Sequence, residues 1–317
     1  MLKPSPEKLH LPVLLEETIE ALAPIPGGTY IDATLGLGGH TEAILERFAG
    51  TRVIGIDQDT EAIGYATERL SRFGSRIRIF HSNFSEIVSV AGEAGIGKVD
   101  GILADLGVSS LQFDSPGRGF SFRFDAPLDM RMNPEPDQET AAEMLERLSE
   151  EEIANVIYQY GEERFSRRIA RWIVERREKG EPVQTTFELA NLVERALRRG
   201  KKDKIHPATR TFQALRIAVN RELEILERFI NESIDLLKTD GRLAVITFHS
   251  LEDRIVKQTF QKRAGKCTCP PRLPVCLCGA EKAVEIVTRK PIIAEDAELE
   301  TNPRARSAKL RVCRKSI

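Results

Sequence analysis

Three glycines follow a short apolar segment at the point where a helix-compatible segment begins. Residues 32–40 read Asp-Ala-Thr-Leu-Gly-Leu-Gly-Gly-His and come directly after the apolar run 29–31. Glycine lets the backbone turn tightly and approach a ligand closely, and a helix that opens at about Gly39 points unpaired N–H groups at that ligand. The spacing of Gly36, Gly38 and Gly39 therefore predicts a cradle for a nucleotide-type cofactor.

Two carboxylates indicate which cofactor suits this cradle. Asp57 ends the next apolar run, 19 positions after Gly38, where a carboxylate accepts hydrogen bonds from ribose hydroxyls. Asp32 directly precedes the glycine loop, where it would repel a pyrophosphate and attract a cation. Thr41 also stands where a dinucleotide-binding pattern has its third glycine. These residues favour S-adenosylmethionine, whose methionine part carries an ammonium group, over a dinucleotide.

The carboxyl ends of two further strands carry candidate site residues. Asp105 closes an apolar run in the segment Ala-Asp-Leu-Gly-Val-Ser-Ser, at the edge where open α/β sheets bind ligands. An unpaired carboxylate at the end of a buried strand is costly, which favours a role in the site. His249 follows a later apolar run and is open to either a structural or a functional interpretation. Ser250 is a candidate N-cap for the helix expected after it.

The first hundred residues alternate strand and helix signals in the rhythm of βαβ units. We expect strands at 29–34, 52–57, 77–82 and 99–106, and helices at 39–48, 60–73 and 84–94. From about residue 112 the chain becomes a loop rich in Gly, Pro and Asp and is then helical, with helices expected at 139–148, 150–160, 163–180 and 185–199.

The α/β pattern resumes near the C-terminus. Apolar residues from Leu215 to Leu237 recur at the three-to-four spacing of one long helix, which Asp240 and Gly241 would end. A fifth strand is expected at 242–248 and a helix at 251–264. The sequence therefore predicts an α/β domain made of residues 1–111 and 213–317, interrupted by a helical insertion at 112–212 that we expect to recognise the substrate.

Composition and charge are those of a water-soluble enzyme with a basic surface. The 317 residues are 41% hydrophobic and 30% charged, and no apolar run approaches the roughly 20 residues that span a bilayer. Because the first residues also lack the apolar core of a signal peptide, we expect a cytoplasmic protein. The net charge is −1, but residues 164–212 carry +8 and residues 254–317 carry +9. Such blocks are typical of a phosphate-backbone contact surface, although solvated helix faces explain the charge equally well.

Within these blocks, two basic clusters are candidate RNA contacts. Arg304 and Arg306 follow Asn302-Pro303 in a rigid turn that suits bidentate phosphate or carboxylate contact, with surface ion pairs as the alternative. The second cluster consists of Arg198, Arg199, Lys201 and Lys202.

Four of the five cysteines gather in one short segment. Cys267, Cys269, Cys276 and Cys278 form a C-x-C-x6-C-x-C pattern. Four thiolates can hold zinc in tetrahedral geometry, but structural zinc sites usually use a C-x2-C spacing. We assign no metal here, and zinc is the alternative to reduced thiols.

Eight segments in order resemble one family, the bacterial small-subunit ribosomal RNA methyltransferase H family, also called MraW. The first four are Gly-Leu-Gly-Gly-His40, Asp105-Leu-Gly-Val-Ser-Ser110, Arg118-Gly-Phe-Ser-Phe122 and Pro127-Leu-Asp-Met-Arg-Met132. The others are Tyr160-Gly-Glu-Glu-Arg-Phe165, His206-Pro-Ala-Thr-Arg-Thr-Phe-Gln213, Phe248-His-Ser-Leu-Glu-Asp-Arg254 and Asn302-Pro-Arg-Ala-Arg-Ser307. The resemblance runs from about His10 to Arg314.

The resemblance implies a Rossmann-like methyltransferase sheet split by a helical insertion, with S-adenosylmethionine as cofactor. It implies methylation of the exocyclic amine (N4) of one cytidine in the decoding region of 16S rRNA, in naked rRNA or in the small ribosomal subunit. The cofactor contacts that it implies are Gly38, Gly39, His40, Asp57, Phe84, Asp105 and Gln112. The cysteine-rich segment is absent from some members, and a homodimer is compatible with the sequence.

The chemistry of the amine leaves the catalytic residue open. Its lone pair is shared with the ring, so attack on the sulfonium methyl requires acceptors that hold the N–H bonds. Many amino methyltransferases place a polar residue, two prolines and an aromatic residue at this strand end, where this chain has Asp105-Leu-Gly-Val. Asp105, a backbone carbonyl near Gly107 and His249 are the candidates. A nicotinamide-dependent oxidoreductase and a non-catalytic RNA-binding assembly factor are the rival functions.

Overall fold

The chain folds as two structural units, which we call the sheet unit and the helical unit. The computed structural model describes residues 11–107, 117–134, 138–197, 206–267, 269 and 282–316. The sheet unit comprises Met1–Ser109 and Leu223–Ile317, and the helical unit comprises Ser110–Glu222. The helical unit therefore extends beyond the predicted range 112–212, mainly at its C-terminal side, because the helix that contains residue 212 runs from Thr209 to Asn220 and belongs to this unit.

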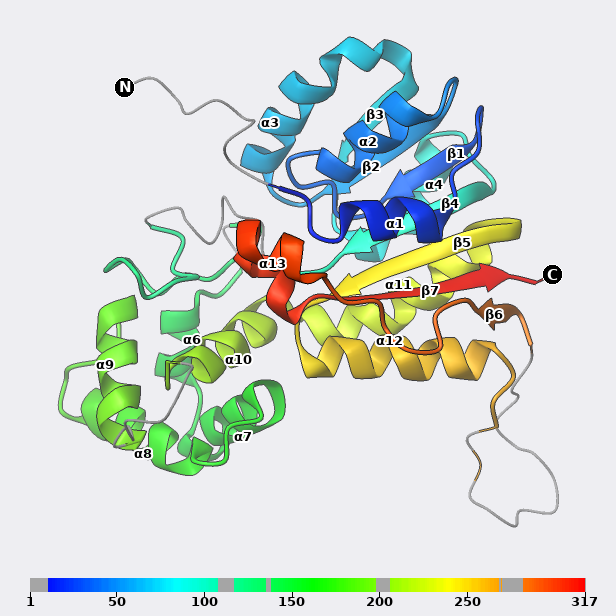
Figure 1. Cartoon of the computed structure of the whole chain (residues 1–317). Coiled ribbons are helices and arrows are strands. Elements are labelled where there is room, and N and C mark those ends of the chain that lie inside the picture. Colours follow the sequence, from blue (N-terminus) through cyan, green and yellow to red (C-terminus); the bar gives the residue numbers. More distant parts are fainter. Residues whose placement is uncertain are drawn as a thin grey trace. The chain divides into compact units, whose positions relative to one another are not determined.

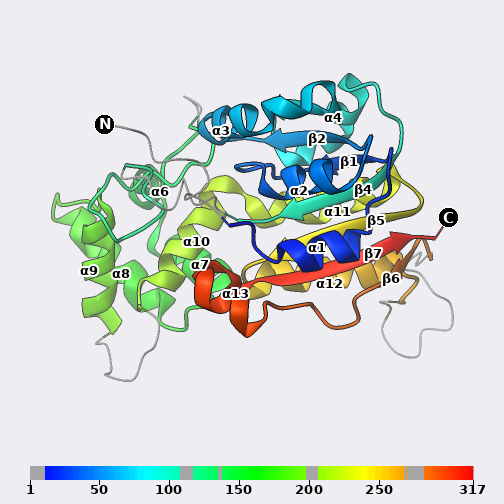
Figure 2. The same ribbon diagram turned by 45° about the horizontal axis from the view of Figure 1, so that its top comes forward.

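Seven strands form the core of the sheet unit in the order β3-β2-β1-β4-β5-β7-β6. Their bounds are Thr29–Asp32 (β1), Arg52–Asp57 (β2), Ile77–His81 (β3), Val99–Asp105 (β4), Leu237–Thr247 (β5), Val284–Ile286 (β6) and Lys309–Lys315 (β7). Strands β1 to β5 are parallel, and β7 runs antiparallel to both β5 and β6, as the arrows in Figures 1 and 2 show. This is a Rossmann-like sheet, as predicted, and the carboxyl ends of its five parallel strands share one edge.

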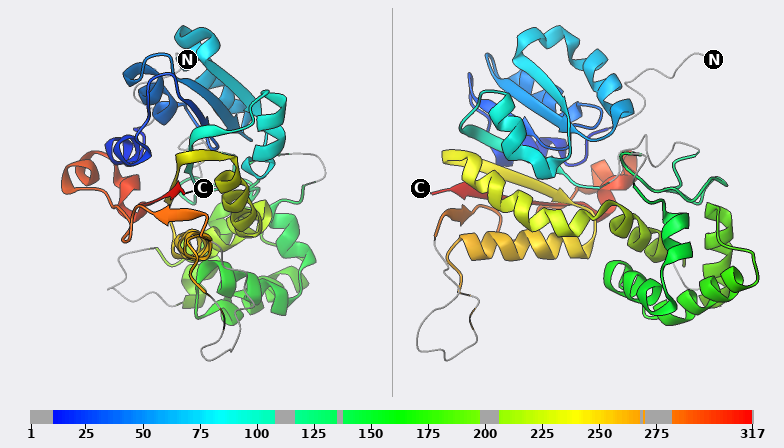
Figure 3. Two further views of the ribbon diagram at one scale, coloured as in Figure 1. Left: turned by 90° about the vertical axis from the view of Figure 1, so that its right-hand side faces the viewer. Right: turned by 180° about the vertical axis from the view of Figure 1, so that it is seen from behind.

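Helices cover both faces of this sheet. On one face lie α1 (Leu15–Leu22), α2 (Gly39–Arg47) and α3 (Thr60–Leu70). On the other lie α4 (Ile87–Glu93), α11 (Glu222–Leu236) and α12 (Ser250–Arg263), the last two seen in front of the sheet in the right panel of Figure 3. Short elements complete the unit, namely η2 (Ser71–Arg76), η3 (Phe84–Glu86), α13 (Asp296–Thr301) and η4 (Pro303–Ser307). No helix in the described part of the chain combines the length and the apolar composition needed to cross a bilayer.

The prediction of one long helix from Leu215 to Leu237 is wrong. Helix α10 (Thr209–Asn220) ends at Arg221, whose backbone is left-handed with φ 52°, and α11 begins at Glu222. A left-handed residue commonly ends a helix. The apolar spacing continues across the break because both helices bury one face, so periodicity alone does not show it. Helix α11 also ends at Leu236, before Asp240 and Gly241.

In the described part of the helical unit, shown in green in Figure 1, the helices are α6 (Ala141–Arg147), α7 (Glu150–Gly161), α8 (Ser166–Glu178), α9 (Thr186–Leu197) and α10. Helices α6 and α7 each begin at a capping box, formed by Thr140 with Glu143 and by Ser149 with Glu152. A Cβ atom on Gly161 would lie 2.5 Å from the carbonyl oxygen of Arg210, so α7 and α10 pack with their backbones in close approach.

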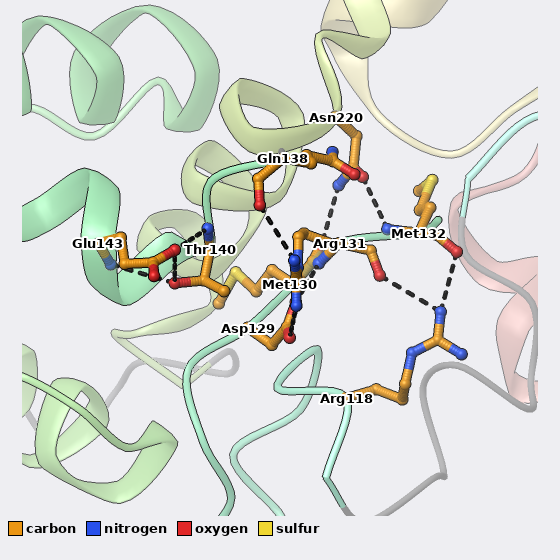
Figure 4. Close-up of polar contacts among 9 residues, drawn as sticks. All are labelled: Arg118, Asp129, Met130, Arg131, Met132, Gln138, Thr140, Glu143 and Asn220. Atoms are coloured by element: carbon orange, nitrogen blue, oxygen red, sulfur yellow. Dashed lines mark hydrogen bonds and ion pairs between the residues drawn. The ribbon is translucent and has the colours of Figure 1, made fainter. Parts of the chain in front are cut away.

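A hydrogen-bonded loop crosses the helical unit at residues 129–132. Met130 is fully buried and has φ 63°, a strained conformation for a residue with a side chain. The Asn220 amide donates to the carbonyl oxygen of Met130 (2.8 Å) and accepts from the N–H of Met132 (2.8 Å). The Arg131 guanidinium forms an ion pair with Asp129 (2.8 Å), as Figure 4 shows. These bonds hold the strained loop in place.

We expect Asn220→Ala to destabilise the helical unit by about 2 to 6 kcal/mol, because it removes two hydrogen bonds to backbone groups of the loop at roughly 1 to 3 kcal/mol each. Amide hydrogen exchange in residues 117–134 and 206–220 measures this, since a two-unit chain need not unfold in one step. Asn231→Ala is the control, because that amide lies on α11, donates to the carbonyl oxygen of Glu227 and accepts from Arg263 at 3.5 Å, and bonds no backbone group of the loop. Equal exchange rates in the two variants would contradict the account.

Candidate active site

The glycine loop follows β1 and begins α2, as the sequence predicts. Gly38 is the N-cap of α2 and has φ 79°, which favours glycine. A Cβ atom there would lie 2.9 Å from Leu70 Cδ1, and one on Gly39 would lie 2.4 Å from Pro12 Cγ. The loop therefore has no room for side chains at Gly38 and Gly39, and it leaves the first N–H groups of α2 at the carboxyl edge of the sheet.

Asp57 fastens the glycine loop to the end of β2. Its Oδ2 accepts a hydrogen bond from the N–H of Gly36 at 2.7 Å, and its Oδ1 accepts one from the N–H of Asp59 at 2.9 Å. Burial raises the pKa of this carboxyl, and the two backbone N–H groups lower it in part. Asp57 thus holds the loop in addition to the ribose contact that its position predicts.

Asp32 lies buried at the end of β1, with only 2% of its surface exposed. Thr41 donates a hydrogen bond from Oγ1 to Asp32 Oδ2 at 2.7 Å, and the N–H of Thr34 donates to Oδ1 at 3.4 Å. Burial raises the pKa of Asp32 to about 6, and the charge of Asp57 adds to the effect. The Thr41 that departs from the dinucleotide pattern is therefore the hydrogen-bond partner of the carboxylate that precedes the loop.

Asp105 is a third acid of the same edge with a raised pKa. Burial raises its pKa to about 8, with a further rise from the charges of Asp32 and Glu252 that the charge of Arg304 partly offsets. Its Oδ1 has no hydrogen-bond partner among the described residues. Its own N–H donates to Thr34 Oγ1 at 2.6 Å, which fixes the end of β4 against the loop after β1. A buried carboxyl in this state is suited to a cation supplied from outside the chain.

The side chain of His40 makes a hydrogen bond inside the protein. It is 6% exposed, and its Nε2 lies 3.1 Å from the carbonyl oxygen of Val13. Burial lowers the pKa of His40 to about 4, so the ring is neutral at pH 7 and Nε2–H donates to Val13. The bond holds residue 13 against α2, next to the contact between Pro12 and Gly39. Direct contact of His40 with a cofactor remains a prediction.

Phe84 stands at the end of the loop after β3. Its ring packs edge-on against Phe229 of α11, with 5.0 Å between the ring centroids, and it is partly buried. The remaining predicted cofactor contact, Gln112, lies outside the described residues. Cys276, Cys278 and the basic cluster Arg198, Arg199, Lys201 and Lys202 also lie outside them, so zinc binding by the cysteine segment, with Cys267 and Cys269, stays untested.

His249, and not Ser250, is the N-cap of α12, so the prediction of a Ser250 cap is wrong. His249 Nδ1 accepts from the N–H of Glu252 at 3.4 Å, and Glu252 Oε2 accepts from the N–H of His249 at 3.2 Å. This is a capping box with an imidazole in place of a hydroxyl. Glu252 Oε1 lies 3.1 Å from Nε2, outside good hydrogen-bond geometry. Because Nδ1 acts as an acceptor, the network places the ring proton on Nε2.

The two arginines of η4 have different surroundings. Arg304 is partly buried, and its charge acts on Asp105. Arg306 is exposed and takes part in none of the ion pairs found among the described residues. The sequence predicts that both arginines contact RNA. In the structure Arg304 lies near the acidic edge, whereas Arg306 lies on the surface.

Comparison with known proteins agrees with this geometry. Residues 7–316 match the model of the MraW methylase family. The chain belongs to this family. It is 53% identical to ribosomal RNA small subunit methyltransferase H of Fusobacterium nucleatum, over 96% of each chain. The proteins of the same name from Symbiobacterium thermophilum and Heliobacterium mobile are 53% and 51% identical, over 95% and 96% of this chain and 95% and 98% of theirs.

The residues of the edge fit S-adenosylmethionine, the cofactor of this methyltransferase. At the glycine cradle, backbone N–H groups are available to a ligand, and the missing side chains let the ligand approach the backbone closely. Asp57 offers carboxylate oxygens for a ribose. Asp32 and Asp105, with their raised pKa values, suit a ligand that carries positive charge. When bound, the cofactor supplies an activated methyl group on a sulfonium. Thr34, Thr41 and Glu252 were missed from the sequence, although Glu252 has the capping-box spacing after His249.

We expect Asp57→Ala to weaken S-adenosylmethionine binding by about 1.5 to 3 kcal/mol, or roughly 10- to 150-fold, because a charged acceptor is lost. Calorimetric titration measures the change. Asp59→Asn is the matched control, because asparagine also caps α3 and should leave the affinity unchanged. An Asp57→Ala protein that folds and binds as tightly as the wild type would remove Asp57 from the cofactor site.

Cofactor binding should release a proton below pH 8. The Asp105 carboxyl holds its proton up to about pH 8 in the free protein, and a bound positive charge favours the carboxylate. Affinity should therefore rise with pH towards 8 and then level off, with Asp32 adding to the slope only near pH 6. Calorimetry in buffers of different ionisation enthalpy counts the protons.

Asp105→Asn should release fewer protons than the wild type between pH 6 and 8. The proton equilibria of the cofactor itself are common to both proteins and cancel in the difference. Identical proton release by the two proteins would show that Asp105 does not respond to the charge of the cofactor.

Proposed function

We propose that the protein methylates the exocyclic N4 amine of a cytidine in the decoding region of small-subunit rRNA, with S-adenosylmethionine as methyl donor. The names of relatives that share about half of the residues over nearly the full chain support the rRNA substrate. The observation that carries the chemistry is the edge formed by Asp32, Asp57 and Asp105, which suits a cationic, ribose-containing cofactor. A retained fold without activity would have no need of a buried carboxyl oxygen that lacks a hydrogen-bond partner among the described residues.

The His249 tautomer narrows the choice of acceptor for the amine. With its proton on Nε2, the ring can donate a hydrogen bond from that atom and cannot accept one there. Of the three candidates, this favours Asp105 or a backbone carbonyl near Gly107. Orientation of the amine towards an already activated methyl group supplies much of the rate, so no strong general base is required. In this proposal Asp105 holds the cofactor charge, and His249 donates to an acceptor on the RNA.

The helical unit offers a surface for the RNA. Arg164 and Arg167 are exposed and belong to none of the ion pairs among the described residues. Between them Phe165 is 56% exposed. The buried carboxylate of Glu163 accepts the N–H of Phe165 at 2.9 Å and so fixes this turn before α8. Exposed arginines beside an exposed ring are what single-stranded RNA binds, through phosphate contacts and base stacking. We propose that the insertion recognises the substrate here.

Small subunits purified from a strain that lacks the gene are the substrate that tests the proposal. We expect the wild-type protein to transfer one labelled methyl group to N4 of a single decoding-region cytidine, mapped by nuclease digestion and mass spectrometry. Arg164→Gln with Arg167→Gln should weaken RNA binding and lower its salt slope by roughly 1.5, at about 0.7 per single-strand phosphate contact.

Lys179→Gln, at the opposite end of α8, is the control for the arginine pair and should leave the salt slope unchanged. No methyl transfer, or transfer to a different atom or nucleotide, would contradict the proposed reaction. An unchanged salt slope in the double variant would remove this turn from the RNA surface.

A further inference from the structure

A pocket of about 290 Å³ opens in the sheet unit at the side of β5 that faces β7. Three segments line it: the junction of β5 and α12 with Phe248 and His249, residues 293–299, and residues 305–309. None of the predicted cofactor contacts lines this pocket. The cofactor cradle is built on β1 and β2, and β4 lies between them and β5 in the sheet. The pocket is therefore a separate cavity at the same edge.

The charged side chains that line the pocket are cationic. The side chain of His249 is 8% exposed, and its Nε2 lies 3.1 Å from Glu252 Oε1 without good hydrogen-bond geometry. Arg306 is exposed and outside the ion pairs of the described residues. Lys309 also lines the pocket, but its charge is matched by Asp253 at 3.4 Å. Asp253 is held more tightly by Arg311, at 2.6 Å. The pocket is thus lined by a buried imidazole and by one guanidinium that lies outside the ion pairs of the described residues.

The rest of the pocket is apolar. Ile293 is 62% exposed although it lines the cavity, and Phe248 and Leu299 are partly buried beside it. A ligand that covers an exposed isoleucine and also meets an unmatched arginine must join a flat or apolar part to an anion. A nucleotide has both, since its base has apolar faces and hydrogen-bond acceptors and its phosphate binds guanidinium. The volume lies at the lower end of the range for small-ligand sites and admits one nucleotide.

We propose that this pocket holds a nucleotide that neighbours the methylated cytidine in the substrate RNA, with its phosphate on Arg306 and its base against Ile293. The inference rests on the proposed function and adds a specificity site to it. Because the target amine must reach the cofactor on the β1 side of Asp105, a pocket on the β5 side suits the adjoining nucleotide. Filling it positions the target, so the pocket acts on RNA binding and alignment rather than on the cofactor.

Two variants test the pocket by different means. Arg306→Gln removes the cation, and Ser307→Phe places a ring in the cavity from an exposed position of its lining. We expect each to raise the KM for small subunits roughly 10-fold or more, the size expected for loss of a charged contact, with the cofactor Kd unchanged. Lys290→Gln is the matched control, because Lys290 is an equally exposed cation that does not line the pocket.

Binding of a decoding-region oligoribonucleotide by fluorescence anisotropy separates this inference from the proposed function. Weaker binding by Arg306→Gln and Ser307→Phe than by Lys290→Gln supports the pocket even when the wild type transfers no methyl group, an outcome that would refute only the proposed reaction. Wild-type affinity and wild-type KM in both pocket variants would overturn the inference. A rise in the cofactor Kd in either variant would also overturn it, since the pocket would then serve the cofactor.

Discussion

Three carboxylates lie at one edge of a parallel sheet with too little positive charge beside them. Asp32, Asp57 and Asp105 end β1, β2 and β4, and burial raises the pKa of each. Isolated buried charges are costly, so such groups hold protons or acquire a counter-charge. Arg304 offsets only part of the effect on Asp105. We expect a ligand that brings its own positive charge to complete the edge, and S-adenosylmethionine meets this requirement.

The surrounding structure keeps these carboxylates in place without neutralising them. Thr41 and Thr34 hold Asp32 and the end of β4, and the backbone N–H groups of Gly36 and Asp59 hold Asp57. All of these partners are neutral. Hydrogen bonds from neutral donors orient a carboxylate and leave its charge available to a ligand, whereas an arginine partner would occupy it. His249 is likewise oriented by a backbone N–H group, because the capping box fixes its tautomer and leaves Nε2–H as a donor.

Local signals were sufficient to predict the glycine loop, Asp57 and the five parallel strands, because each depends on periodicity and glycine chemistry within a few residues. Strand β7 was missed because its basic residues were read as surface charge, although Arg311 is only 6% exposed and pairs with Asp253. The helix break at Arg221 gave no signal, since arginine is not a residue typical of left-handed backbone. The pKa of Asp105 depends on Asp32, Glu252 and Arg304, which meet only in the folded sheet.

The titration of Asp105 tests most directly whether the carboxylates at this edge bind a positively charged cofactor. In protein labelled with carbon-13 at aspartate carboxyl carbons, the resonance assigned by its loss in Asp105→Asn should titrate near pH 8 without cofactor. Saturating S-adenosylmethionine should move that midpoint to a lower pH, because the bound positive charge favours the carboxylate. A midpoint near pH 4 in the free protein, or one that does not move when the cofactor binds, would contradict the account.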